Sequence, residues 1–333
     1  MVLHKTAGED IPELERYQRQ FLTAGAAGAV VSLIGYFQNP TQFFQSYLMA
    51  YMFVLGLSLG SLALGMVHQL SGGAWGVVIR RQMGAASRVL PIVTVLFLPI
   101  IFGMPHLYEW THADVVANDP ILQGKQAYLN TPFFLARAAF YFVVWNGLAF
   151  QIVMLSWLSK RKPMSDALTP TYLGDLAGLM FAFVVLWAYM SFSQYLIIWS
   201  GNLPEEIMWY LHRMQGGWVP MGIVLVVFHF ALPFFLLLMR GIKRRTGLVS
   251  KVAIAIIFAR LLDLFWLIAP ETHHDGLVVS WMDIVIPVTL FALFVGLYLQ
   301  QLRQRPLLPV NDPQFEEALG PVLAHGANPG TAH

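Results

Sequence analysis

Two residues of opposite charge lie three positions apart inside a long apolar segment of this 333-residue chain. Arg260 and Asp263 both belong to the segment 249–270, which is otherwise mainly apolar. On a helix, a spacing of three places both side chains on one face. Ionisable side chains are costly inside a membrane and typically form structural ion pairs or line proton and ion pathways. The spacing leaves two interpretations open: a self-neutralising pair that joins helices, or part of a proton relay.

A third titratable residue, His229, lies at the centre of another apolar segment, residues 216–240. Histidine titrates near neutral pH, so it suits proton transfer or a hydrogen bond to a quinone. A lone histidine among aromatic residues is more often a packing residue with a satisfied hydrogen bond, and we favour that interpretation over a relay. Pro233 follows four residues later and cannot donate the helical hydrogen bond to the carbonyl of His229.

Other titratable residues lie near the ends of the apolar segments. Asp175 begins the segment 172–200, where a carboxylate could admit protons or simply stabilise a helix N-terminus. Eight charged or titratable residues follow the segments 172–200 and 249–270. They could gather around the mouth of one pathway, form a hydrated rim, or form a docking surface for a partner: Glu205, Glu206, His212, Arg213, Glu271, His273, His274 and Asp283. The candidates for a proton path are His229, Arg260, Asp263, Asp175, Glu205, Glu206 and His212.

Several kinds of chemistry are excluded on this chain. It contains no cysteine, so it cannot hold an iron–sulfur cluster, a covalently attached c-type haem or a disulfide. Of its ten histidines, only His229 lies in the middle of an apolar segment, whereas a b-type haem needs facing axial ligands. The adjacent His273 and His274 do not have the spacing of a metal site. We expect no metal, no catalytic residues of its own and no nucleic-acid partner.

The elements that must position these residues are membrane-spanning helices. Hydrophobic residues make up 57% of the chain and charged residues 11%, with a mean hydropathy of +0.61. Such a composition lies far outside the range of soluble domains, and apolar segments long enough to cross a bilayer recur along the chain. We predict an all-α polytopic membrane protein with about eight transmembrane helices, at residues 20–37, 43–68, 88–106, 132–158, 172–200, 216–240, 249–270 and 279–301.

Charge in the connecting loops orients these helices. The loops 69–88, 159–171 and 240–251 and both terminal flanks are rich in Lys and Arg, whereas the alternate loops are mainly acidic. By the positive-inside rule, both termini are therefore cytoplasmic. The predicted organisation is a cytoplasmic segment 1–19, a transmembrane helical domain 20–301 and a cytoplasmic tail 302–333.

Two blocks of the sequence resemble a known family. The first is WAYMSFSQYLIIWSGNLPEEIMWYLHR (187–213), followed by GGW and by FHFALPFFLLLMR (228–240). The second is LGSLALGMVHQLSGGAWGVVIRR (59–81), followed by LPIVTVLFLPIIFG and LYEW. Both are similar to the ActF-type membrane subunit of bacterial alternative complex III, a member of the NrfD-like (polysulfide-reductase membrane subunit) family. The resemblance extends from about residue 43 to about residue 270.

The resemblance implies a multi-pass subunit in the bacterial inner membrane, within a quinol:electron-acceptor oxidoreductase of a respiratory or photosynthetic chain. It implies menaquinol or ubiquinol as the substrate of the complex, with haem c and iron–sulfur clusters on partner subunits. Those partners are a related NrfD-like membrane subunit, an iron–sulfur subunit, and multihaem and monohaem cytochrome c subunits, besides lipid. By this resemblance the chain would anchor the complex. The titratable residues inside its apolar segments, rather than the resemblance, indicate that it could also provide a polar path for protons. The sequence identifies no quinone-binding residue.

One feature departs from the family. NrfD-like proteins contain two four-helix bundles, and the loop 159–171 leads almost directly into the fifth predicted helix, so the chain looks two helices short. This difference puts an intact second bundle in doubt. Two alternatives to the respiratory subunit stay open: a stand-alone secondary transporter or channel that uses the same polar residues, and a purely structural membrane anchor. The sequence contains no inverted repeat of the kind that many transporters have.

Overall fold

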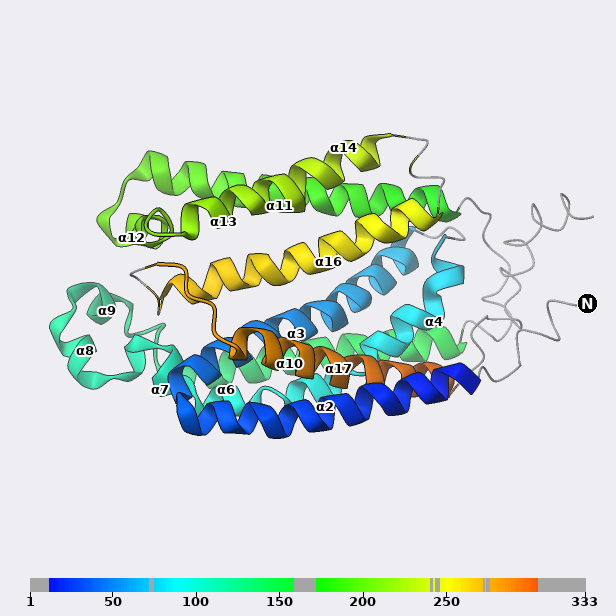
Figure 1. Ribbon diagram of the computed structural model, residues 1–333, viewed down its shortest axis with the longest axis horizontal. Coiled ribbons are helices and arrows are strands. Elements are labelled where there is room, and N and C mark those ends of the chain that lie inside the picture. The colour runs from blue at the N-terminus through cyan, green and yellow to red at the C-terminus, as the bar shows by residue number, and fades with distance from the viewer. Residues whose placement is uncertain are drawn as a thin grey trace, which may run out of the picture.

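The computed structural model describes residues 12–71, 75–158, 172–239, 242, 246–271, 273 and 276–304, and all regular elements of this part are helical. Seven helical segments in it are long and apolar enough to cross a membrane. These segments run in both directions along one common axis (Figure 1). The chain is therefore an all-α polytopic membrane protein, as the composition predicts.

The spans and the elements outside them alternate along the chain. The spans consist of α2 (Pro12–Gln38), α3 (Pro40–Ser71), α4 to α6 (Trp75–Ser87, Leu90–Val95 and Leu98–Phe102), α11 (Tyr172–Gly201), α13 with η2 and α14 (Trp218–Leu225, Val226–Ala231 and Leu232–Leu238), α16 (Thr246–Ile268) and α17 (Met282–Arg303). The short elements are α7 (Met104–Leu107), η1 (Glu109–Thr111), α8 (Ala113–Asn118), α9 (Pro120–Lys125), α12 (Pro204–Arg213) and η3 (Ala269–Glu271). Helix α10 (Thr131–Leu158) coincides with the predicted fourth span, but many of its side chains lie outside the described part, so the count of eight stays a prediction.

The third span differs from its predicted bounds of 88–106. It covers Ile79–Phe102, and α4 occupies much of the segment that was assigned to the loop 69–88. Arg80 and Arg81 lower the hydropathy there, although long arginine side chains are compatible with the end of a span because their charged groups can extend to the interface. Pro91 and Pro99 each lie in the first turn of a short helix and divide the rest of this span.

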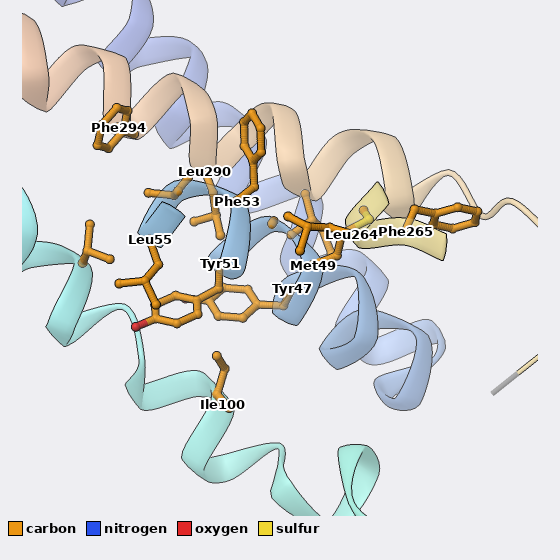
Figure 2. Close-up of a cluster of buried hydrophobic side chains, with 14 of the residues drawn as sticks. Tyr47, Met49, Tyr51, Phe53, Leu55, Ile100, Leu264, Phe265, Leu290 and Phe294 are labelled. Atoms are coloured by element: carbon orange, nitrogen blue, oxygen red, sulfur yellow. The ribbon is translucent and has the colours of Figure 1, made fainter. Parts of the chain in front are cut away.

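Helix α3 forms the centre of the main apolar core. Its side chains pack between α17 and α16 on one side and the α5–α6 segment on the other (Figure 2). The Tyr47 hydroxyl donates to the carbonyl of Leu96 at 2.7 Å, which satisfies a polar group in this core. Buried residues make up 44% of the α3 span and 50% of the α17 span, but only 6% of the α11 span. Of the seven described spans, α11 has the smallest buried share.

Helices α2 and α17 lie side by side over most of their lengths (Figure 1). Glycine permits this close approach: a Cβ on Gly25 would lie 2.6 Å from the Leu293 side chain, and one on Gly28 would overlap Thr289. On the opposite helix, a Cβ on Gly296 would lie 2.6 Å from the Leu22 side chain. Small residues let the two backbones come together, as is common in membrane helix pairs.

The described ends of the chain lie at the same end of the bundle. Residues 12 and 304, at the start of α2 and just beyond α17, lie opposite α8, α9 and α12 (Figure 1). Helix α2 begins before residue 20, so part of the predicted N-terminal segment 1–19 is helical. Most of the predicted tail, from residue 305 onward, lies outside the described residues.

Candidate functional site

Asp263 is a buried carboxylate near the middle of the α16 span. The residue is 4% exposed. Its Oδ2 accepts a hydrogen bond from Nη1 of Arg260, one turn earlier on the same helix. The expected proximity of these two residues is therefore confirmed as an ion pair, which we call the mid-span pair.

The mid-span pair is asymmetric. The Asp263 side chain is buried, whereas the Arg260 side chain is 44% exposed on the surface of the chain. Removing the arginine alone would leave a buried carboxylate without its cation, at a cost of about 3–5 kcal/mol. The exposed part of Arg260 makes the pair accessible from outside the packed interior, as a proton site requires.

His229 lies in a π-helical turn of the span Trp218–Leu238. The turn, η2, interrupts an otherwise α-helical segment between α13 and α14, and Pro233 lies at the start of α14. Because Pro233 has no N–H, the carbonyl of His229 loses its α-helical donor, and a π-helical turn is one way for the backbone to accommodate this loss. His229 is 5% exposed, and its Nδ1 is buried without a hydrogen-bond partner. The sequence favours a packing residue whose hydrogen bonds are satisfied, but the hydrogen bonding of His229 is incomplete at Nδ1.

Trp187 contacts both His229 and the mid-span pair. Its ring centroid is 4.1 Å from that of His229, with an interplanar angle of 36°. Its indole Nε1–H points to Oδ2 of Asp263 at 3.4 Å, which is long for a hydrogen bond. Among the described residues, no hydrogen bond joins His229 directly to Asp263. Three spans thus supply a mid-span cluster of four residues: Trp187 from α11, His229 from η2, and Arg260 and Asp263 from α16.

The sequence analysis did not identify Trp187 as a site residue. A signal was nevertheless present, because Trp187 lies near the middle of α11, whereas tryptophans of membrane helices concentrate at the two interfaces. A buried indole N–H usually requires an acceptor, so a tryptophan at mid-depth indicates a polar partner nearby. Nothing in the sequence showed that this partner would be Asp263.

Of the other four proton-path candidates, the structure describes the side chains of two, and these lie outside the mid-span cluster. Asp175 is in the first turn of α11 and Glu205 near the start of α12, but both side chains lie outside the described part. Glu206 is exposed and His212 is partly buried, and both belong to α12 at the end of the bundle. The structure therefore brings together His229, Arg260 and Asp263, and leaves Glu206 and His212 at a separate level.

Arg213 is buried rather than part of a hydrated rim. Its guanidinium donates to the carbonyls of Trp209 at 2.6 Å, Leu267 at 2.7 Å and Trp266 at 3.3 Å, and to the Glu271 carboxylate at 3.1 Å. Burial lowers the pKa of Arg213 from its ordinary value, and the Glu271 carboxylate opposes this shift. The residue joins α12 to the C-terminal end of α16, whose last carbonyls lack helical donors.

Asp283 is also buried, in a polar network that joins three segments. Its Oδ1 accepts from the Ser46 hydroxyl at 2.6 Å and from Nε2 of Gln42 at 2.9 Å. Its Oδ2 accepts from the backbone N–H of Ser280 at 2.9 Å, as in the capping box of a helix N-terminus. Gln42 also lies 2.9 Å from Nε2 of His273. These contacts give Asp283 and His273 a structural role in joining α3 to α17; His274 lies outside the described residues.

The described residues contain no group of three or more His, Asp or Glu side chains arranged to hold a metal ion. The polar groups at mid-depth are instead suited to binding and passing protons: a carboxylate, an imidazole and a partly accessible guanidinium. Comparison of the chain with protein-family models and with curated proteins gave no match.

Proposed function

We propose that this chain is an integral membrane subunit of a quinol-oxidising electron-transfer complex of the alternative complex III type. In this proposal it anchors the complex and carries protons through the mid-span cluster. Membership of the complex rests on the resemblance of the segments 59–81 and 187–240 to the ActF-type subunit. The proton path rests on one observation: Asp263 and His229 are buried near the middle of apolar spans, with Arg260 reaching the surface of the chain.

The proposed setting is the bacterial inner membrane, with eight spans and both termini in the cytoplasm. The alternation of basic and acidic loops supports this orientation. The position of residues 12 and 304 at one end of the bundle agrees with an even number of spans. Under this arrangement α8, α9 and α12 lie on the outer side, where soluble electron-carrying partners would dock.

The redox centres of the proposed complex belong to its other subunits. Haem c would be held by multihaem and monohaem cytochrome subunits, and iron–sulfur clusters by an iron–sulfur subunit. A related NrfD-like membrane subunit would complete the membrane part, with menaquinol or ubiquinol as the substrate. The lack of cysteine on this chain supports that division of roles, since it rules out cysteine-held clusters and haems here.

Within this chain, the mid-span cluster has the properties that proton transfer at mid-depth requires. A proton bound by the Asp263 carboxylate leaves Arg260 with an uncompensated charge, and release of the proton restores the ion pair. The ion pair limits the cost of the ionised carboxylate in an apolar environment, and the 44% exposure of the Arg260 side chain limits the cost of its unpaired charge when Asp263 is protonated. The His229 imidazole offers a second proton-binding group on a neighbouring helix.

Two measurements test the proposal. The first is purification from native membranes: the chain should copurify with haem-bearing and iron–sulfur subunits, and its purification as a single polypeptide would favour the transporter alternative. The second uses the double variant Arg260→Leu, Asp263→Leu, which removes both charges and so avoids an unpaired buried ion. We expect this complex to assemble but to lose proton movement coupled to quinol oxidation.

A matched control removes an ion pair at the ends of two spans, away from the mid-span cluster. Glu15 and Arg303 pair at 2.8 Å near the ends of α2 and α17, and Glu15→Gln with Arg303→Gln should leave coupled proton movement unchanged. If the Leu double variant retains normal coupling, the mid-span pair is structural and the chain is an anchor without a proton path.

A further inference from the structure

The Trp187 side chain contacts both buried titratable groups of the mid-span cluster, His229 and Asp263. One face of its indole lies against the His229 ring, with 4.1 Å between ring centroids, and its N–H points at Asp263 from 3.4 Å. An indole N–H donates a hydrogen bond but does not accept one, and it does not titrate in the physiological range. Trp187 therefore cannot itself pass a proton from Asp263 to His229, although it contacts both.

The sparse packing of α11 within this chain allows the Trp187 side chain to move away from the cluster. The α11 span is only 6% buried within the chain, and the neighbouring Leu186, Tyr189 and Met190 are exposed. A side-chain rotation of Trp187 away from the cluster thus requires little rearrangement of this chain's interior. The contact that holds the indole toward Asp263 is also long, so it gives the closed position only a weak hydrogen bond.

We propose that Trp187 is a gate that controls proton transfer between Asp263 and His229, an inference that rests on the proton path proposed above. With the gate closed, the indole separates the carboxyl from the imidazole. When the indole moves away, the proton leaves the Asp263 carboxyl, which becomes a carboxylate paired with Arg260. The unpartnered Nδ1 of His229 accepts that proton, directly or through a water molecule, and the ring becomes an imidazolium. No bond other than those to this proton is made or broken.

Proton flux into vesicles tests the gate. The full-length chain, with any subunits that copurify, is reconstituted into liposomes that contain a pH-sensitive dye, and a potassium gradient with valinomycin drives proton entry. We expect Trp187→Ala to raise passive proton flux about tenfold or more over the parent, equivalent to lowering the barrier by about 1.4 kcal/mol or more. Trp187→Phe keeps a ring against His229 but removes the N–H, so it should produce a smaller rise. It also serves as the test variant if Trp187→Ala does not fold.

Two further variants identify the route of that flux. Adding His229→Gln to either Trp187 variant should return the flux to the parent level, because the proton acceptor is then missing. Trp199→Ala is the matched control: it removes a tryptophan from the same helix that is 64% exposed and not part of the cluster, and the flux should not change. The gate is refuted if neither Trp187 variant raises the flux, if the rise persists with His229→Gln, or if Trp199→Ala raises it equally.

The outcome for the gate is separable from that for the proposed function. If the variant Arg260→Leu, Asp263→Leu loses coupled proton movement while the Trp187 variants do not leak, the path stands and only the gate is wrong. If that double variant keeps normal coupling, the path itself is wrong, and the gate is refuted with it.

Discussion

Replacement of Arg213 by methionine should reveal how strongly one buried guanidinium stabilises the end of the bundle where α12 lies. The group is 1% exposed and donates to the carbonyls of Trp209, Leu267 and Trp266 at 2.6, 2.7 and 3.3 Å. It also lies 3.6 Å from the centre of the Trp209 ring. Methionine has a similar length and fills the space, but it has no donor for the three carbonyls.

The expected loss follows from these contacts. Hydrogen bonds from a charged donor contribute about 1.5–3 kcal/mol each, and we take the lower part of this range for the two short bonds and about 0.5–1 kcal/mol for the long one. The sum predicts that Arg213→Met lowers the free energy of unfolding by about 4 kcal/mol. The Glu271 partner is 50% exposed, so its ion pair with Arg213 should contribute less than about 1 kcal/mol.

Reversible unfolding in mixed micelles, followed by circular dichroism, measures the free energy of unfolding and so gives both the effect of Arg213→Met and the contribution of the ion pair with Glu271. Glu271→Gln is the matched control, because it removes the ion pair and leaves all three bonds to the backbone carbonyls. Arg213→Lys should lie between the two, since a single ammonium cannot reproduce the geometry of the guanidinium. The reasoning would be refuted if Glu271→Gln and Arg213→Met lowered the free energy of unfolding equally, because the ion pair would then dominate.

Four further predictions concern other parts of the chain. A topology reporter fused after Asn202 should lie outside the cytoplasm, and a cytoplasmic signal would overturn the orientation. The isolated polypeptide should show no haem absorption. Stoichiometric haem would contradict this prediction and would make His229 the candidate ligand. Asp283→Ala should lower the free energy of unfolding by about 2–3 kcal/mol, because the Ser46 hydroxyl and the Ser280 backbone N–H lose their acceptor. An unchanged unfolding transition would contradict the stabilising role of this network. Gly28→Val should reduce the yield of folded protein by forcing α2 away from α17, whereas wild-type yield would show that the helices can separate without cost.

The sequence by itself determined the class of fold and the approximate position of nearly every span. Apolar segments of this length must satisfy their backbone hydrogen bonds internally in a bilayer, so an apolar run in this chain predicts a helix without knowledge of its neighbours. It also determined the mid-span pair, because Arg260 and Asp263 lie three residues apart on one helix and helical geometry alone brings them together. The predicted start of the third span was wrong because Arg80 and Arg81 lower the hydropathy of a segment that is nevertheless helical.

Contacts between helices were decided only by the tertiary structure. Gln42 and Asp283 are 241 residues apart, and Trp187 and Asp263 are 76 apart, so no local rule could pair them. Hydropathy gives each span its length but does not show which spans become neighbours or how each is rotated about its axis. Arg213 illustrates the physical reason: its position in a polar loop predicts solvent exposure, yet the carbonyls at the end of α16 and the ring of Trp209 provide a buried site that compensates for the lost hydration.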